Sequence, residues 1–108
     1  MLPTLTNESE ILIWGEDSLK KEILARAAKE LRDGGIIVGP TETRYGLLVR
    51  ADSPECMRKL FALKGRDKSY PTAIFVRSIE EMKEIAIVNE TAFRLAREFL
   101  PGPLTIVL

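Results

Sequence analysis

Two short stretches of the sequence concentrate side chains that could bind or transform a ligand. The first directly follows the apolar run 36–38 and consists of Thr41, Glu42, Thr43, Arg44 and Tyr45. Ligands of open α/β sheets bind beyond the carboxyl ends of strands, so these polar groups could bind a carboxylate, an amine or a phosphate. The alternative is a capped turn, in which Pro40 presets the backbone and the hydroxyl groups bond to nearby backbone atoms.

The second stretch is basic and lies where a predicted helix ends. Lys64, Arg66 and Lys68 surround a glycine in the sequence LKGRDKSYP. Arginine can hold a polyphosphate as a bidentate fork and lysine as a point charge. The alternative is that these cations only complement the dipole at the helix C-terminus. The glycine patterns of P-loops and of dinucleotide-binding folds are both missing from the sequence.

The composition excludes several classes of protein. The 108 residues suit a single domain spanning residues 1–108. Lys+Arg and Asp+Glu both total 16, which disfavours a protein that coats duplex nucleic acid. With no histidine and only Cys56, the chain has no internal disulfide and lacks the commonest metal ligands. Asp52 and Asp67 could hold magnesium, but isolated carboxylates at turns usually act as caps, so we expect no metal site made by protein ligands alone.

The same inventory indicates a cellular compartment. A single cysteine and the lack of a signal peptide predict a cytoplasmic protein. No apolar run is long enough to span a bilayer, so we expect no membrane contact.

Helical and strand patterns alternate along the chain, which predicts the α/β class. Predicted helices begin near residues 17–18, 53–54, 78 and 89, and predicted strands cover residues 11–14, 36–38, 45–49, 72–76 and 104–108. The terminal strand is apolar and needs neighbours on both edges. We therefore expect a domain that is incomplete at its C-terminus, or a homodimer or partner chain that covers this strand.

Four motifs occur together and in order: Gly-Gly before an apolar strand, Pro-Thr-Glu-Thr-x-Tyr-Gly, Lys-x-Arg and Pro-Gly-Pro-Leu-Thr. With this spacing, residues 19–108 resemble the N-terminal part of a YrdC-like domain, the family that includes the threonylcarbamoyl-AMP synthases. The resemblance implies a YrdC-like fold, with a twisted mixed sheet flanked by helices. The family's domain continues past the last motif, so the resemblance also implies that its second half is missing here.

The resemblance implies a reaction in which L-threonine, bicarbonate and ATP give threonylcarbamoyl-adenylate and pyrophosphate. The product serves the threonylcarbamoyladenosine modification of tRNA. On this interpretation Thr43 contacts the threonine substrate, while Thr41 and Tyr45 shape its pocket. Lys64 and Arg66 are the catalytic residues that hold the ATP phosphates and stabilise the departing pyrophosphate, with Mg²⁺ assisting.

The chain departs from the family pattern at several of these positions. Arg44 replaces a small apolar residue, and Leu48 replaces a glycine. Tyr70 stands where the family has an asparagine that contacts the nucleotide, so we count Tyr70 among the nucleotide-binding residues. Phe75 falls near a family histidine that contacts threonine. The sequence does not decide whether this chain is an enzyme by itself, because the family's second half completes the nucleotide site.

The alternative function is a non-catalytic RNA- or nucleotide-binding module of the same fold. A basic patch would then contact double-stranded RNA or tRNA, and its affinity would fall steeply with salt. The patch would consist of Arg44, Arg50, Arg58, Lys59, Lys64, Arg66 and Lys68.

Overall fold

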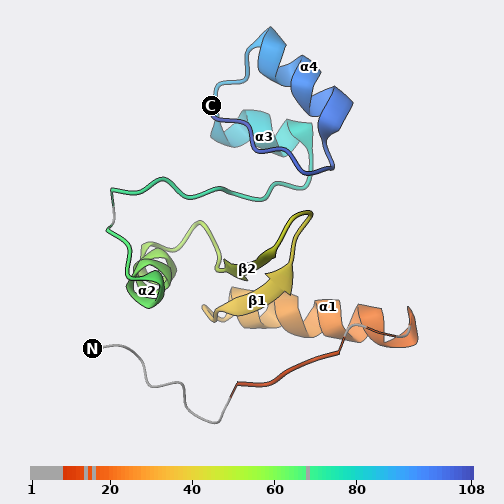
Figure 1. Ribbon diagram of the computed structural model, residues 1–108, viewed down its shortest axis with the longest axis vertical. Helices are drawn as coiled ribbons and strands as arrows, with labels where there is room; N and C mark the ends of the chain where they lie inside the picture. The colour runs from red at the N-terminus through yellow and green to blue at the C-terminus, as the bar shows by residue number, and fades with distance from the viewer. Residues whose placement is uncertain (1–8, 14, 16, 68) are drawn as a thin grey trace. The chain divides into compact units, whose positions relative to one another are not determined.

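A computed structural model describes residues 9–13, 15, 17–67 and 69–108 of the chain. It confirms the predicted α/β class. The elements are α1 (Asp17–Arg32), β1 (Ile37–Pro40), β2 (Tyr45–Leu48), α2 (Pro54–Lys64), α3 (Ile79–Ile85) and α4 (Glu90–Phe99) (Figure 1). The described residues fall into two compact units. The first comprises residues up to 40 together with residues 45–70, and the second comprises residues 41–44 and 71–108.

In the first unit, α1 is an amphipathic helix with an apolar residue at every fourth position. This stripe consists of Leu19, Ile23, Ala27 and Leu31. The helix ends at Gly34, whose φ of 86° lies in the left-handed region that favours glycine. The N–H groups of Gly34 and Gly35 donate to the carbonyls of Leu31 and Glu30, at 3.1 and 2.8 Å. This paired closure of the last turn is a Schellman motif.

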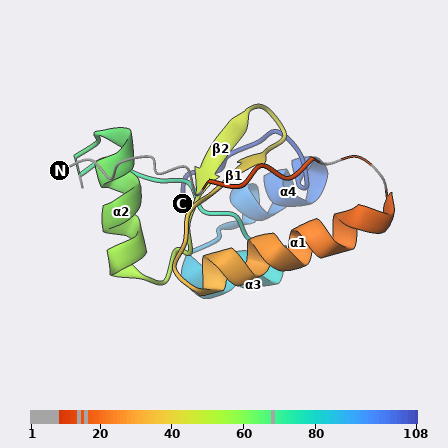
Figure 2. The same ribbon diagram turned by 90° about the horizontal axis from the view of Figure 1, so that it is seen from below.

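The strands β1 and β2 form an antiparallel hairpin, and they lie side by side in both ribbon views (Figures 1 and 2). Ile37 pairs with Leu48 at the open end, and Pro40 pairs with Tyr45 next to the turn. α1 packs beside β1. The hairpin therefore presents residues 41–44 as a tight connection at its closed end.

The helix α2 begins as predicted, with Ser53 as its N-cap and Pro54 at the first helical position. The Ser53 hydroxyl accepts a hydrogen bond from the N–H of Cys56 at 3.3 Å. Cys56 and Leu60 are the buried side chains of this helix, at 4% and 3% exposure. These two side chains, one helical turn apart, define the buried face of α2.

In the second unit, α3 and α4 form a helix pair, and each helix begins at a capping residue near its predicted start. The Ser78 hydroxyl accepts from the N–H of Glu81 at 3.1 Å, and Asn89 Oδ1 accepts from the N–H of Ala92 at 2.8 Å. Met82 of α3 and the small residues of α4 are buried in this unit. The Lys83 ammonium lies 4.6 Å from the centre of the Phe93 ring, a distance typical of cation–π contacts.

Several predicted strands are not formed by the described residues. Residues 72–76 and 104–108 have no strand structure, and neither do residues 11–13; Trp14 lies outside the described residues. The sheet made by the described residues is a two-stranded antiparallel one, not the larger twisted mixed sheet expected. The physical reason is pairing, since an extended apolar segment becomes a strand only beside a hydrogen-bonding neighbour.

The unpaired segments leave apolar side chains in contact with solvent. Phe75 is 70% exposed and Val107 is 93% exposed. In the part of the chain that the structure describes, no helix is both long and apolar enough to cross a bilayer.

Candidate functional site

The connection between β1 and β2 is closed by the side chain of Thr41. Its backbone N–H donates to the Arg44 carbonyl at 2.9 Å, and its hydroxyl donates to the same carbonyl at 2.5 Å. The hydroxyl oxygen also accepts from the N–H groups of Thr43 and Arg44, at 3.3 and 3.1 Å. A hydroxyl has one proton and two acceptor sites, so these bonds saturate it. For Thr41 the turn-capping alternative is what the structure shows.

The other three residues of this turn present their side chains to solvent. Glu42, Thr43 and Arg44 are exposed, and none of their side chains makes a hydrogen bond or ion pair with a described residue. Tyr45, the first residue of β2, is 78% exposed. The Thr43 hydroxyl is therefore available to a ligand, whereas the Thr41 hydroxyl holds the backbone that presents it.

Lys64 and Arg66 lie on either side of the glycine that ends α2. Gly65 has a φ of 65°, and its N–H donates to the Ala62 carbonyl at 3.2 Å. The N–H of Arg66 donates to the Phe61 carbonyl at 3.0 Å, which completes a second Schellman motif. Both cationic side chains are exposed and unpaired among the described residues. Two free cations thus flank a backbone turn of fixed shape.

The loop after Arg66 is organised by Asp67. One of its carboxylate oxygens accepts from the N–H of Ser69 at 3.2 Å, and its carbonyl accepts from the N–H of Tyr70 at 3.1 Å. The prediction that Asp67 caps a turn is confirmed. Tyr70 is 60% exposed, so its ring is accessible to a nucleotide base. Lys68, the third predicted cation of this loop, lies outside the described residues.

The predicted site residues thus form two clusters. The hairpin turn (residues 41–44) belongs to one compact unit, and the end of α2 with its following loop (residues 64–70) belongs to the other, which also contains Tyr45. That the two clusters build one site stays a prediction.

Arg50 has a structural role that the sequence analysis did not foresee. Its guanidinium binds both carboxylate oxygens of Asp52, at 2.6 and 2.8 Å, and donates to the Arg32 carbonyl at 2.9 Å. The hydrogen bond from Arg50 lowers the pKa of Asp52 below its ordinary value of 3.8. The opposite charges of Arg50 and Asp52, two residues apart in the sequence, were the signal from which this pair could have been predicted. Arg50 is therefore already engaged, which weakens its place in the predicted basic patch.

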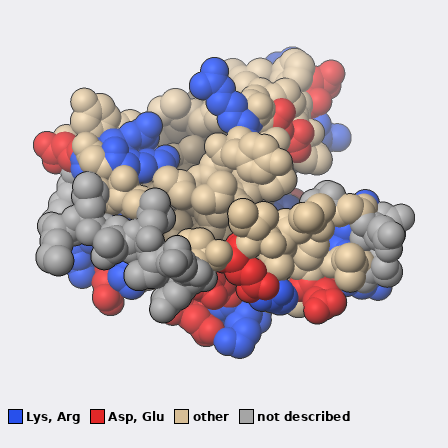
Figure 3. Space-filling view, turned by 60° about the horizontal axis from the view of Figure 1, so that its bottom comes forward, with Lys and Arg blue, Asp and Glu red and all other residues tan. Residues whose placement is uncertain are grey.

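The charges on the surface are mixed. On the face drawn in Figure 3, acidic and basic side chains lie next to one another, in keeping with the equal totals of 16. Lys29 pairs with Asp33 at 2.7 Å, and the hydrogen bond from Lys29 lowers the pKa of Asp33. Such exposed pairs neutralise positive charge that a nucleic-acid-binding surface would use.

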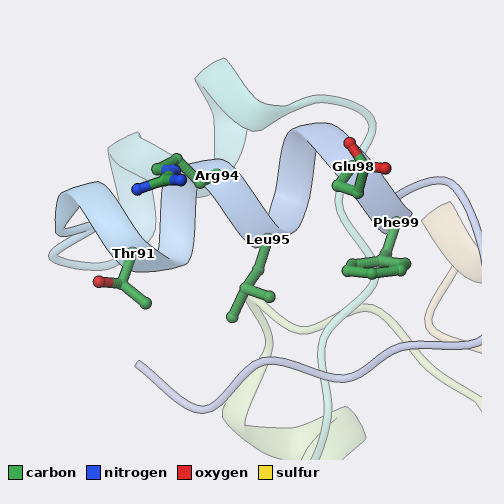
Figure 4. A pocket seen from close by; sticks show the side chains of 5 residues that line it. All are labelled: Thr91, Arg94, Leu95, Glu98 and Phe99. Carbon is green, nitrogen blue, oxygen red and sulfur yellow. The ribbon is translucent and has the colours of Figure 1, made fainter.

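A shallow groove of about 380 Å³ runs along one face of α4 (Figure 4). It is lined by Thr91, Arg94, Leu95, Glu98 and Phe99. None of the predicted site residues contributes to this groove.

Comparison with known proteins identifies the family. The Sua5/YciO/YrdC profile, described as "Telomere recombination", matches residues 29–108. The chain is 40% identical over 99 residues to the threonylcarbamoyl-AMP synthase of Pyrococcus abyssi, covering 91% of this chain and 29% of that protein. It is 33% identical to the human threonylcarbamoyl-AMP synthase over 81% of this chain and 31% of the human protein. It is also 25% identical to the uncharacterized protein YciO of Escherichia coli, over 85% of this chain and 45% of YciO.

The chain therefore belongs to the Sua5/YciO/YrdC family, as the motifs predicted. It spans less than half the length of the curated relatives it matches. No solved structure matches the chain.

Proposed function

We propose that this chain supplies the threonine-binding turn and the phosphate-binding helix end of a threonylcarbamoyl-adenylate synthase. The observation that carries the proposal is the pair of cations Lys64 and Arg66, which have no partner among the described residues and lie on either side of the left-handed Gly65. Relatives named threonylcarbamoyl-AMP synthase match most of this chain, which supports the same chemistry here. The product would serve the threonylcarbamoyladenosine modification of tRNA, in the cytoplasm.

The proposed reaction places limited demands on the protein. L-Threonine and bicarbonate form a carbamate with loss of water; a carbamate oxygen then attacks the α-phosphate of ATP, and pyrophosphate leaves. Such chemistry depends on positioning and charge neutralisation more than on a covalent nucleophile. Lys64 and Arg66 would hold the phosphates and stabilise the charge that develops on the departing pyrophosphate. A chain without histidine can do this, because the attacking carbamate is already an anion.

The remaining predicted residues take the substrate-binding roles. The free hydroxyl of Thr43 would bind the threonine substrate, with Thr41 holding the turn and Tyr45 bordering the pocket. The exposed Tyr70 ring would lie against the nucleotide.

Magnesium would enter with the phosphates of ATP. Mg²⁺ commonly binds through substrate phosphates and one or two carboxylates. Asp67 follows Arg66 directly, and the hydrogen bond from Ser69 engages only one of its two carboxylate oxygens. Asp67 is therefore the described carboxylate best suited to assist the metal at this cluster.

A larger twisted mixed sheet of the YrdC-like kind is part of the proposal. Residues 72–76 and 104–108 are apolar and lack strand neighbours, so they would gain hydrogen bonds by pairing with further strands. These strands would come from further residues of the same domain, from a second copy or from a partner chain. Pairing predicts slowed amide exchange in both segments when the partner is present, and unchanged exchange would contradict it.

The test of the phosphate site is calorimetric titration with Mg-ATP. Lys64→Ala and Arg66→Ala should each weaken binding by about 10-fold to 100-fold, since a charge-assisted hydrogen bond contributes roughly 1.5–3 kcal/mol. Arg58→Ala is the matched control, because it removes another exposed cation, which lies within α2. Equal affinities for all three variants and the wild type would refute the assignment of Lys64 and Arg66.

The same variants separate this proposal from a non-catalytic RNA-binding module. If a basic patch binds double-stranded RNA or tRNA, Arg58→Ala should weaken RNA binding as much as Lys64→Ala does, and affinity should fall steeply with salt. RNA affinity that is weak and flat with salt counts against the module.

A further inference from the structure

Arg44 combines a fixed backbone with an unengaged guanidinium. Its N–H donates to the Thr41 hydroxyl, and its carbonyl accepts from both the hydroxyl and the N–H of Thr41. Both backbone groups are therefore occupied within the turn. Only the side chain is free to meet a ligand, and it extends from a position that four hydrogen bonds within the turn define.

Some other exposed arginines among the described residues are neutralised by carboxylates. Arg26 pairs with Glu10 and Arg50 pairs with Asp52. The second pair shows that a separation of two residues is short enough for a bidentate contact. Glu42 stands two residues from Arg44 in a turn, yet the two make no ion pair. The turn geometry thus leaves the guanidinium of Arg44 without its nearest acidic neighbour.

We propose that Arg44 binds the α-carboxylate of the amino-acid substrate and so helps determine which substrate is accepted. This inference rests on the proposed threonine-dependent function. The planar guanidinium matches a carboxylate with two parallel hydrogen bonds, which fixes orientation as well as charge.

The neighbouring Thr43 makes this assignment specific to a hydroxy amino acid. Consecutive Cα atoms are about 3.8 Å apart, so Thr43 and Arg44 present a hydroxyl and a guanidinium from adjacent points of one rigid turn. L-Threonine carries its hydroxyl and its carboxylate on neighbouring carbons. On this proposal one small substrate engages both residues, with Arg44 taking the charge and Thr43 the hydroxyl.

The test varies the ligand and the residue together. L-Threonine and L-threoninamide, which replaces the carboxylate by a neutral amide, are titrated into the chain in the presence of Mg-ATP. The wild type should prefer L-threonine, and Arg44→Gln should lower the affinity for L-threonine by about 10-fold to 100-fold. The same variant should leave the affinity for L-threoninamide unchanged, so the preference disappears. Arg44→Lys should keep part of the preference for L-threonine, because lysine keeps the positive charge but cannot make the two parallel hydrogen bonds of a guanidinium.

Arg58→Gln is the matched control and should retain the wild-type preference. A preference for L-threonine that persists in Arg44→Gln would overturn the inference, and so would an equal loss of affinity for L-threonine and L-threoninamide. The same holds if Arg44→Gln weakens tRNA binding while the preference persists, which would make Arg44 a nucleic-acid contact. If the wild type binds Mg-ATP without preferring L-threonine, the proposed role of Arg44 is refuted, whereas the proposed phosphate site is not. If the wild type binds neither Mg-ATP nor L-threonine, both proposals fall.

Discussion

Replacing Gly65 by alanine should disturb the proposed phosphate-binding end of α2 through the backbone alone. An alanine Cβ at this position would have no atom within 4 Å, so steric overlap contributes nothing. The φ of 65° remains, and holding a non-glycine residue in the left-handed region costs about 1–2 kcal/mol. The melting temperature should fall by roughly 4–8 °C for each kcal/mol in a domain of this size.

The same substitution should weaken Mg-ATP binding, because Lys64 and Arg66 take their positions from this turn. If alanine shifts φ to negative values, the N–H of Arg66 loses the Phe61 carbonyl, and the spacing of the two cations changes. Gly65→Asn is the control, since asparagine adopts the left-handed region at lower cost than alanine. Thermal unfolding and Mg-ATP titration should show a clear defect for alanine and a smaller one for asparagine. Full stability and affinity in Gly65→Ala would refute the reasoning.

Two further predictions concern the hairpin turn and its surroundings. Thr41→Val should lower the free energy of unfolding by about 1–2 kcal/mol, because it removes the hydroxyl that closes the turn. Thr43→Val should leave the free energy of unfolding unchanged and weaken L-threonine binding. Denaturation measures the first effect and calorimetry the second, and equal stability of both variants would contradict the capping role of Thr41. The hydrogen bond from Arg50 lowers the pKa of Asp52, so this pair stabilises the folded state above pH 3.8 and loses its effect as the pH falls through the lowered value. The stability difference between the wild type and Asp52→Asn should therefore shrink on acidification from about pH 5 to about pH 2, and a constant difference would count against the pair.

The helices could be predicted from the sequence because their signals are local. Ser53, Ser78 and Asn89 each accept the expected hydrogen bond from an N–H of the first helical turn. Gly34 and Gly65 each take the left-handed conformation that ends a helix. Caps and glycine stops depend on residues a few positions apart, so no information about distant segments is needed.

The strands could be predicted only where pairing is also local. Residues 37–40 and 45–48 are joined by a four-residue turn, and they form the hairpin. Residues 72–76 and 104–108 have the composition of strands, but pairing depends on partners that a local pattern does not contain. The prediction of strands there therefore failed in the structure described, although the apolar pattern was identified correctly.

The candidate site was likewise only partly predictable from the sequence. The sequence singled out residues 41–45, but it could not separate the roles of two threonines that lie two positions apart. Thr41 closes the turn and Thr43 remains free, and this difference arises from hydrogen-bond geometry. The engagement of Arg50 by Asp52 likewise depends on rotamers that a residue list does not specify.

The most direct test of the central claim is the coupling between the two clusters. Mg-ATP is titrated into the chain by calorimetry, first alone and then with saturating L-threonine and bicarbonate. If the hairpin turn and the end of α2 build one site, Mg-ATP should bind more tightly when L-threonine is present, since coupling between two ligands is reciprocal. An Mg-ATP affinity that is the same with and without L-threonine, or no Mg-ATP binding at all, would contradict a shared threonine and nucleotide site in this chain.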